Sequence, residues 1–288
     1  MHPAPSVIVF TVLSGIGFGF LACLGLGLVG VQGWAAFWVW GLGYALAVAG
    51  LASSAFHLGN PQRALLAFTQ WRTSWLSREA VLSVAALVTL APMALSDWLG
   101  LGFPRVVGVL AAGLAVASVI ATAMIYAQIR AVPRWHHWVT PVLFLSFALT
   151  GGLILSGHSR VAVLACLGLV VALRVAFRLG DGQFARAGQT MGTATGLAGD
   201  VSVFEWPHTG DNYLLREMIH VVGRRHSARL RLIAVVMAGL VPAGVLLLVP
   251  GVVGIGVAAV AHLTGACAAR WLFFAEAEHV VGLYYGRR

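Results

Sequence analysis

The sequence has 288 residues, of which 60% are hydrophobic and only 9% are charged, and its mean hydropathy is +0.91. Soluble domains carry roughly 25% charged residues, so this composition excludes a soluble globular fold, and the abundance of apolar residues excludes a disordered chain. All 18 basic residues behind the net charge of +9 are arginines, which rules out lysine-dependent Schiff-base and Walker-type chemistry.

Eight apolar segments are long enough to cross a bilayer, which takes about 20 helical residues. They lie near residues 7–30, 35–56, 79–99, 105–129, 138–156, 160–178, 230–249 and 252–275. A turn at Pro250 and Gly251 separates the last two segments. The sequence therefore predicts an all-α integral membrane protein, with one membrane domain over residues 1–288 that forms a bundle of eight transmembrane helices.

The arginines are divided unevenly between the two sides of this predicted bundle. With eight spans, both termini share one side, together with the loops that follow the second, fourth and sixth spans. Only Arg105 and Arg160 fall on the opposite side. Because cytoplasmic loops of membrane proteins are enriched in arginine and lysine, we expect both termini in the cytoplasm. Arginines placed between apolar spans indicate contact with lipid headgroups and not with nucleic acid.

One long segment, residues 179–228, lies on the terminus side and holds five of the nine acidic residues. A loop of this length in a compact protein is usually functional. Residues 212–219 have the pattern of a short amphipathic helix at the membrane surface. We interpret 179–228 as a cytoplasmic loop that docks a partner; the alternative is an interfacial helix that only anchors the loop.

Polar and aromatic residues gather at the terminus-side ends of the second to fifth spans. Because polar groups in a membrane are expensive, their position is informative. A quinone needs an apolar, partly aromatic slot, donors to its carbonyls and a group that exchanges protons. We therefore predict a quinone site with His57 and Glu79 as proton-exchanging groups, drawn from the following binding candidates: His57, Arg63, Trp71, Trp75, Ser77, Arg78, Glu79, Tyr126 and Gln128.

Chemical roles within this group follow from residue type. An imidazole titrates near neutral pH, which favours His57 as the proton partner, and the neighbouring Arg78 is expected to keep nearby carboxylates ionised. Structural alternatives stay open for four kinds of candidate, and for His57 the alternative is a helix-end histidine hydrogen-bonded to a loop carbonyl. Ser77 can cap the third helix with Glu79 in its first turn, Tyr126 can serve helix packing, and the tryptophans can form an interfacial aromatic belt.

Other cofactors and functions are less well supported. A transmembrane b-type cytochrome needs two axial histidines on facing helices, and His262 is the only histidine well inside a span, so we expect no haem. Cys23, Cys166 and Cys267 lie far apart, so we expect no metal site and no disulfide. A secondary transporter is the other alternative, but transporters place polar groups near the midplane, whereas here they gather at one face.

Two segments, residues 57–64 and 71–79, resemble the membrane-anchor subunit family of dimethyl sulfoxide reductase. Further similarity to this family lies in residues 124–128, 134–137 and 212–218 and in Arg225 and His226, in the expected order. The resemblance implies an eight-helix anchor without haem, whose partners are a molybdopterin catalytic subunit and a four-cluster iron–sulfur subunit. Such an anchor exchanges electrons with the quinone pool, either ubiquinone or menaquinone.

The resemblance also implies roles for two residues, since His57 and Glu79 match family positions tied to the quinone site. Relatives in this family serve dimethyl sulfoxide reduction or cytoplasmic sulfite oxidation. The expected cytoplasmic docking face favours the sulfite-oxidising type, whose catalytic subunits face the cytoplasm.

Overall fold

The computed structural model describes residues 2–57, 60–205, 210, 212–214, 218–219 and 226–286, with the backbone alone at residues 56, 57 and 61. Within these residues every regular element is a helix, which confirms the predicted all-α class.

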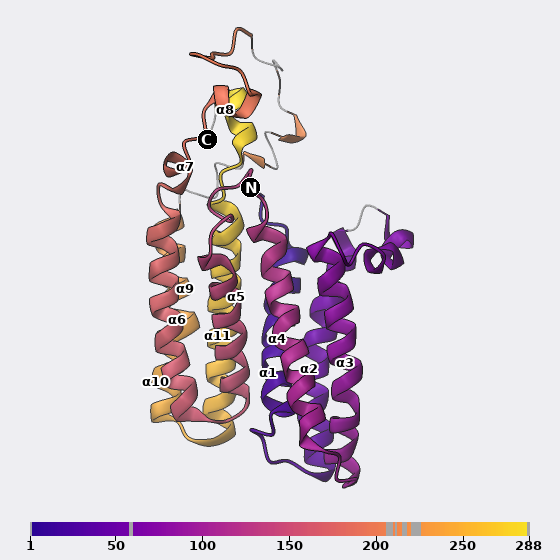
Figure 1. The fold of residues 1–288 in the computed structure, drawn as a ribbon. Helices are drawn as coiled ribbons and strands as arrows, with labels where there is room; N and C mark the ends of the chain where they lie inside the picture. The colour runs from indigo at the N-terminus through magenta and orange to yellow at the C-terminus, as the bar shows by residue number, and fades with distance from the viewer. Residues whose placement is uncertain are drawn as a thin grey trace.

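Eight apolar helical stretches of the described chain run alongside one another (Figure 1). They are α1 (Pro5–Gly25), α2 (Gly33–Ser53), α3 (Trp75–Leu99), α4 (Arg105–Ala127), α5 (Val139–Leu155), α6 (Ser159–Gly180), the joined segments α9 (Ser227–Val235), η5 (Val236–Leu240) and α10 (Val241–Leu248), and α11 (Gly251–Ala275). All except α5 have the length and hydropathy of a membrane span. The 17 residues of α5 reach about 25 Å, which still approaches the thickness of the hydrocarbon core.

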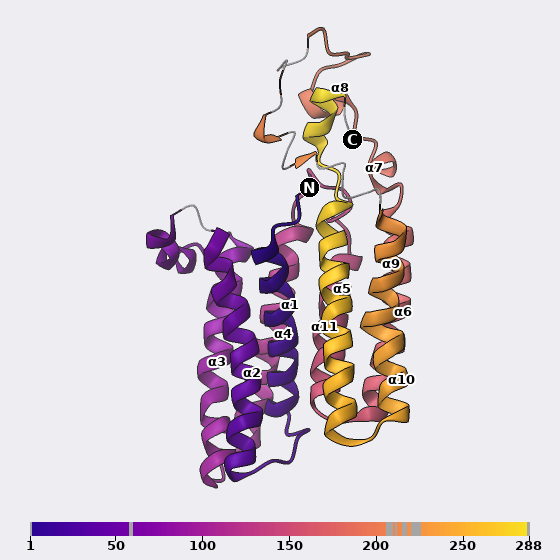
Figure 2. The same ribbon diagram turned by 180° about the vertical axis from the view of Figure 1, so that it is seen from behind.

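The short elements gather at one end of the bundle, where both termini also lie (Figures 1 and 2). These elements are η1 (Ser54–His57), η2 (Pro61–Phe68), α7 (Gln183–Arg186), α8 (Met191–Thr195) and η6 (Val280–Tyr285). We refer to this end as the terminus end. The opposite end has only short connections between helices, as the sequence predicted.

Helix α1 lies at the centre of the bundle and packs against α2, α4, α5 and α11. Glycines allow this close approach: a Cβ atom on Gly19 would lie 1.9 Å from the carbonyl oxygen of Ala148 in α5. On the α2 side, a Cβ atom on Gly50 would lie 2.3 Å from the backbone nitrogen of Ser14. Small residues at helix contacts are typical of membrane bundles, because packing there depends on van der Waals contact.

The two largest differences from the predicted helix boundaries have local reasons. The first helix ends at Gly25 instead of residue 30, because Gly27 adopts a left-handed conformation (φ +72°) and the Leu28 amide donates back to the Cys23 carbonyl at 3.0 Å. The third helix begins at Trp75, four residues before the predicted 79. Ser74 is its N-cap and accepts a hydrogen bond from the Ser77 amide at 3.5 Å.

The connection between α6 and α9 contains α7 and α8. The amphipathic helix predicted at residues 212–219 falls mostly outside the described residues, so it stays a prediction, as does the docking role of 179–228.

Candidate functional site

Glu79 of α3 is enclosed between helices, with only 4% of its surface exposed. The hydroxyl of Thr122 in α4 donates a hydrogen bond to its carboxylate at 2.5 Å. One turn deeper, the hydroxyls of Ser83 and Ser118 are 2.6 Å apart. Since residues four apart lie on the same face of a helix, these two contacts are successive polar rungs between antiparallel helices. The contact between α3 and α4 therefore holds Glu79 in the apolar interior, where it is hydrogen-bonded to Thr122.

Tyr126 lies one turn from Thr122 on α4 and is also buried. Its ring centroid is 5.3 Å from those of both Trp135 and Phe273, and it contacts further rings at Phe144 and Phe274. Edge-to-face contacts of this kind fix the orientation of an aromatic ring. Helix packing, one of the two roles left open for Tyr126, is thus present, and the ring cluster closes the site on the side of α5 and α11.

Arg270 of α11 is the second buried charge at this depth, with 4% of its surface exposed. The guanidinium carbon lies 3.6 Å from the centroid of the Phe144 ring, which is a close cation–π contact. Among the described residues, the guanidinium has no hydrogen-bond acceptor within range. Because an arginine has five N–H donors, a buried side chain in this position is suited to a further acceptor.

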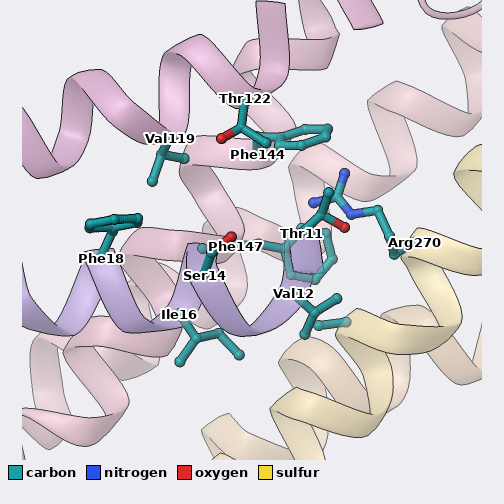
Figure 3. A pocket seen from close by; sticks show the side chains of 12 residues that line it. Thr11, Val12, Ser14, Ile16, Phe18, Val119, Thr122, Phe144, Phe147 and Arg270 are labelled. Atoms are coloured by element: carbon teal, nitrogen blue, oxygen red, sulfur yellow. The ribbon is translucent and has the colours of Figure 1, made fainter. Parts of the chain in front are cut away.

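A small cavity lies beside Arg270, between α1, α4, α5 and α11 (Figure 3). Figure 3 shows the guanidinium turned toward Thr11 and Phe144, with Thr122 and Ser14 also bordering this space. The cavity volume of about 10 Å³ has room for roughly one water molecule. Thr122 borders the cavity and also bonds Glu79, so it connects the buried carboxylate with the space that Arg270 faces.

The rim above Glu79 is held by backbone carbonyls of the loop before α3. Arg78 donates from Nε to the carbonyl of Trp71 at 3.0 Å and from Nη2 to that of Arg72 at 2.7 Å, and its guanidinium stacks on the Trp75 ring at 4.3 Å. These contacts stabilise the loop, and the described contacts of Arg78 do not include Glu79. The expected effect of Arg78 on nearby carboxylates therefore lacks a direct contact.

Ser77 also fixes this loop. It is 2% exposed, and its hydroxyl donates to the carbonyl of Ala67 in η2. The helix cap is Ser74, so the capping role considered for Ser77 belongs to the residue three positions earlier.

The other candidates are dispersed. Arg63 and Gln128 are exposed, and the side-chain amide of Gln128 donates to the Ile125 carbonyl at its own helix end, at 3.3 Å. Trp71 is 55% exposed, which suits an interfacial position. The backbone of His57 ends η1, and its side chain lies outside the described residues. The structure thus brings Glu79 and Tyr126 together with Thr122 and Arg270 and leaves Arg63 and Gln128 on the surface.

The sequence interpretation missed Arg270 and Thr122. Arg270 lies inside the predicted span 252–275, and an arginine inside an apolar span is a functional candidate by position alone. A threonine in a membrane helix carries no such signal, since its partner depends on the register between α3 and α4.

His262 lies deeper in α11 and is 1% exposed. Its Nδ1 is 2.8 Å from the Ala238 carbonyl oxygen; because a carbonyl only accepts, Nδ1 is the protonated nitrogen. Nε2 has no hydrogen-bond partner in the described part of the chain. No group of three histidine, cysteine or acidic side chains with metal-binding geometry occurs among the described residues.

A network of four charged residues joins α6, α9 and α11 at the terminus end. Arg231 donates to both oxygens of Asp181, at 2.6 and 2.7 Å, and to Glu276 at 2.6 Å. Arg134 pairs with the same two acids. The hydrogen bonds from Arg231 hold the pKa of Asp181 below its usual range, against the opposing effect of partial burial.

The comparisons with known proteins bear on this arrangement. The family model described as DMSO reductase anchor subunit (DmsC) matches residues 1–179. The chain belongs to this family. It is also similar to the C subunit of the sulfite dehydrogenase of Allochromatium vinosum, with 31% identity over 99% of each chain. No solved structure matches.

Membership in the DmsC family confirms the resemblance drawn from the sequence motifs. The matched region contains nearly all of α1 to α6 and with them Glu79, Thr122 and Tyr126. Arg270 lies beyond it, in the part that only the full-length relative covers. The apolar helices and the family together make the chain a multi-pass membrane-anchor subunit of an oxidoreductase complex.

Proposed function

We propose that this DmsC-family anchor exchanges electrons and protons with the quinone pool on behalf of a sulfite-oxidising molybdoenzyme. The observation that carries the quinone role is the buried Glu79–Thr122 pair beside Arg270, which holds a carboxyl group and a guanidinium inside an apolar bundle near one end. The similarity to the C subunit of a sulfite dehydrogenase along the full chain supports sulfite over dimethyl sulfoxide as the substrate of the complex.

The proposed partners are a molybdopterin catalytic subunit and an iron–sulfur subunit, docked at the terminus end over η2 and the 179–228 loop. This end carries both the short elements and the rim above Glu79 (Figures 1 and 2). An iron–sulfur centre seated there brings electrons to the end of the bundle where the buried carboxylate lies. We place this end in the cytoplasm of a bacterial inner membrane.

Reduction of a quinone to a quinol takes two electrons, which arrive singly from the iron–sulfur subunit, and two protons. Glu79 and His57 are the proposed proton donors to the two carbonyl oxygens, each then recharged from the cytoplasm. Thr122 orients the Glu79 carboxyl group through its hydrogen bond. Arg270 supplies a fixed positive charge deeper in the site, at the cavity that Thr122 also borders.

The size of the cavity limits where a quinone ring can lie. With a volume of about 10 Å³, the space beside Arg270 takes a water molecule but not a ring. We therefore place the ring at the rim, against the loop that Ser77 and Arg78 hold. The cavity then holds an internal water molecule next to Thr122 that takes part in proton transfer.

Replacement of Glu79 by Gln tests this proposal. The amide keeps the size and hydrogen-bonding capacity of the side chain but cannot exchange a proton, so quinone-coupled sulfite oxidation should fall by roughly 10²-fold or more. Sulfite oxidation with an artificial soluble dye should persist, because it bypasses the anchor. The matched control is Asp97→Asn, which makes the same carboxyl-to-amide change at the far end of α3, away from the proposed docking surface. Unchanged quinone-coupled turnover in Glu79→Gln membranes, with normal subunit assembly, would remove Glu79 from the mechanism.

His57 is tested in the same assay by His57→Gln. Loss of quinone-coupled turnover with retained dye activity is expected. If turnover persists, proton exchange has to be assigned to Glu79 alone.

A further inference from the structure

A groove with a volume of about 330 Å³ lies between α6 and α9 near the terminus end, apart from the Glu79 site. Three arginines and one aspartate line it: Arg174, Arg178, Arg231 and Asp181. Its apolar wall is formed by Phe177, Leu232 and Val235. The groove thus combines a basic mouth with a hydrocarbon wall.

The charge of the groove is not balanced within the described part of the protein. Arg231 is neutralised in the network with Arg134, Asp181 and Glu276, which contains two positive and two negative side chains. Arg174 and Arg178 are exposed and form no ion pair with any described residue. Being four residues apart on α6, they point to the same side of the helix. Two positive charges are therefore left without a counter-charge on one face.

That face of α6 is the side that meets lipid. Leu164, Leu167 and Val171 are 69%, 45% and 61% exposed, and they precede Arg174 and Arg178 at alternating spacings of three and four residues. This spacing makes one continuous apolar stripe that ends in the two arginines. Arg174 lies about 9 Å from the end of α6 at Gly180, at 1.5 Å per residue, which corresponds to the level of lipid headgroups and upper acyl chains.

We propose that this groove binds one anionic phospholipid. The phosphate of the headgroup is held by Arg174 and Arg178, and an acyl chain lies along the stripe from Leu164 to Val171. An unpaired arginine at this depth is costly, and a lipid phosphate supplies the missing counter-charge together with strong hydrogen-bond acceptors. Cytoplasmic-side arginines of membrane proteins generally attract anionic lipids. Here the groove provides a defined binding position for one such lipid.

Native mass spectrometry of the full-length chain in a non-ionic detergent tests the proposal, with phosphatidylglycerol or phosphatidylcholine added in equal amounts. The wild type should retain one phosphatidylglycerol in preference to phosphatidylcholine. In the double variant Arg174→Gln/Arg178→Gln, phosphatidylglycerol binding should weaken by roughly 30-fold, since each arginine near a membrane surface contributes about a fivefold factor. Glutamine preserves the polar, unbranched side chain.

The matched control is Arg130→Gln/Arg160→Gln, which removes the same charge from exposed positions outside the groove, one of them at the other end of α6. It should retain phosphatidylglycerol as the wild type does. Equal loss in both double variants would show a general charge effect and overturn the proposal, as would displacement of the lipid by millimolar inorganic phosphate.

A second measurement does not depend on the variants folding. Photoactivatable phosphatidylglycerol added to the wild-type chain should cross-link to the peptide containing residues 164–178. Cross-links confined to other helices would overturn the site. Loss of these cross-links when the soluble subunits are bound would show that a protein partner covers the groove in place of a lipid, which would also overturn it.

Discussion

The hydrogen bond from Thr122 to Glu79 explains how the carboxyl group proposed to exchange protons can lie buried in the bundle. A carboxyl group 4% exposed inside an apolar bundle is stabilised only if its oxygens find donors. Among the described residues, the Thr122 hydroxyl supplies that donor at 2.5 Å. Thr122 is therefore a positioning residue for the Glu79 carboxyl group.

Thr122→Val should expose this dependence, because valine has nearly the shape of threonine and lacks the hydroxyl. Loss of the donor to a buried group should lower the free energy of unfolding by about 1–3 kcal/mol, measured by thermal or denaturant unfolding in detergent. The loss of unfolding free energy should be smaller when the same change is made in Glu79→Gln protein, since leaving a neutral amide without this donor costs less than leaving a carboxylate without it. Equal effects in both backgrounds would mean that Thr122 does not act through Glu79.

The sequence could point to Glu79 and Tyr126, because polar residues at the ends of apolar spans stand out and match a family motif. Thr122 and Arg270 required the structure. Their contributions depend on which faces of α4 and α11 turn inward, and helices as uniformly apolar as these give little periodicity from which to read a face. The exposure of Gln128 also required the structure, since the sequence does not show whether a polar residue at a helix end points inward or outward.

At the scale of elements, the fit of α1 against α2 depends on glycines. A Cβ atom at Gly50 would lie 2.3 Å from the backbone nitrogen of Ser14, a contact that only backbone movement can relieve. A Cβ atom at Gly41 on the same helix would meet nothing within 4 Å.

Gly50→Ala should therefore destabilise the protein by roughly 1–3 kcal/mol through overpacking, whereas Gly41→Ala should be neutral or slightly stabilising because alanine favours the helix. Thermal unfolding of the two variants in one detergent measures the difference. Similar melting temperatures would indicate that α1 and α2 separate at little cost.

Helix existence could be predicted from hydropathy alone, because roughly 20 consecutive apolar residues leave few alternatives. Helix ends could not, because they depend on local hydrogen bonds. Because Ser74 caps α3, this helix begins several residues before the predicted boundary. Because Gly27 forms a turn, the first helix ends several residues before the apolar segment does. The π-helical segment η5 within the seventh span likewise leaves no mark on hydropathy.

The charged network between α6, α9 and α11 carries a pH prediction. The pKa of Asp181 is lowered in the folded protein, chiefly by hydrogen bonds from Arg231. A lowered folded-state pKa stabilises the fold above the unfolded value of about 3.9, and this stabilisation is lost as the pH falls through the folded-state pKa. The carboxylate side chain is 52% exposed, so solvent screening limits its contribution to no more than about 1 kcal/mol.

Asp181→Asn should accordingly lower stability slightly at pH 7 and flatten the stability curve below about pH 4. Melting temperatures measured between pH 3 and 8 test this, with Asp200→Asn in an exposed loop as the control. A curve for Asp181→Asn parallel to the wild type at acidic pH would contradict the role of this ion pair.

Across the protein, the candidate functional groups are concentrated at one end of the bundle. The short elements and both termini lie at the terminus end, whereas the other end has only short turns (Figures 1 and 2). The charged network and the groove beside Arg174 belong to the same end. In the proposed function, electron transfer, proton exchange and partner docking would therefore all take place on a single side of the membrane. The side on which this end lies therefore determines whether the proposed turnover moves charge across the bilayer.

Arginine distribution predicts that the terminus end faces the cytoplasm, since only Arg105 and Arg160 lie toward the other end. Cysteine labelling tests this in a background where Cys23, Cys166 and Cys267 are replaced by alanine. Leu101→Cys lies in the turn between α3 and α4 at the far end, and Ala187→Cys lies in the loop at the terminus end; both positions are exposed. A membrane-impermeant maleimide added to spheroplasts should label Leu101→Cys at once and Ala187→Cys only after lysis. The opposite pattern would put the Glu79 rim on the outer face, where protons for quinone reduction would come from outside the cell and a cytoplasmic sulfite-oxidising partner could not dock.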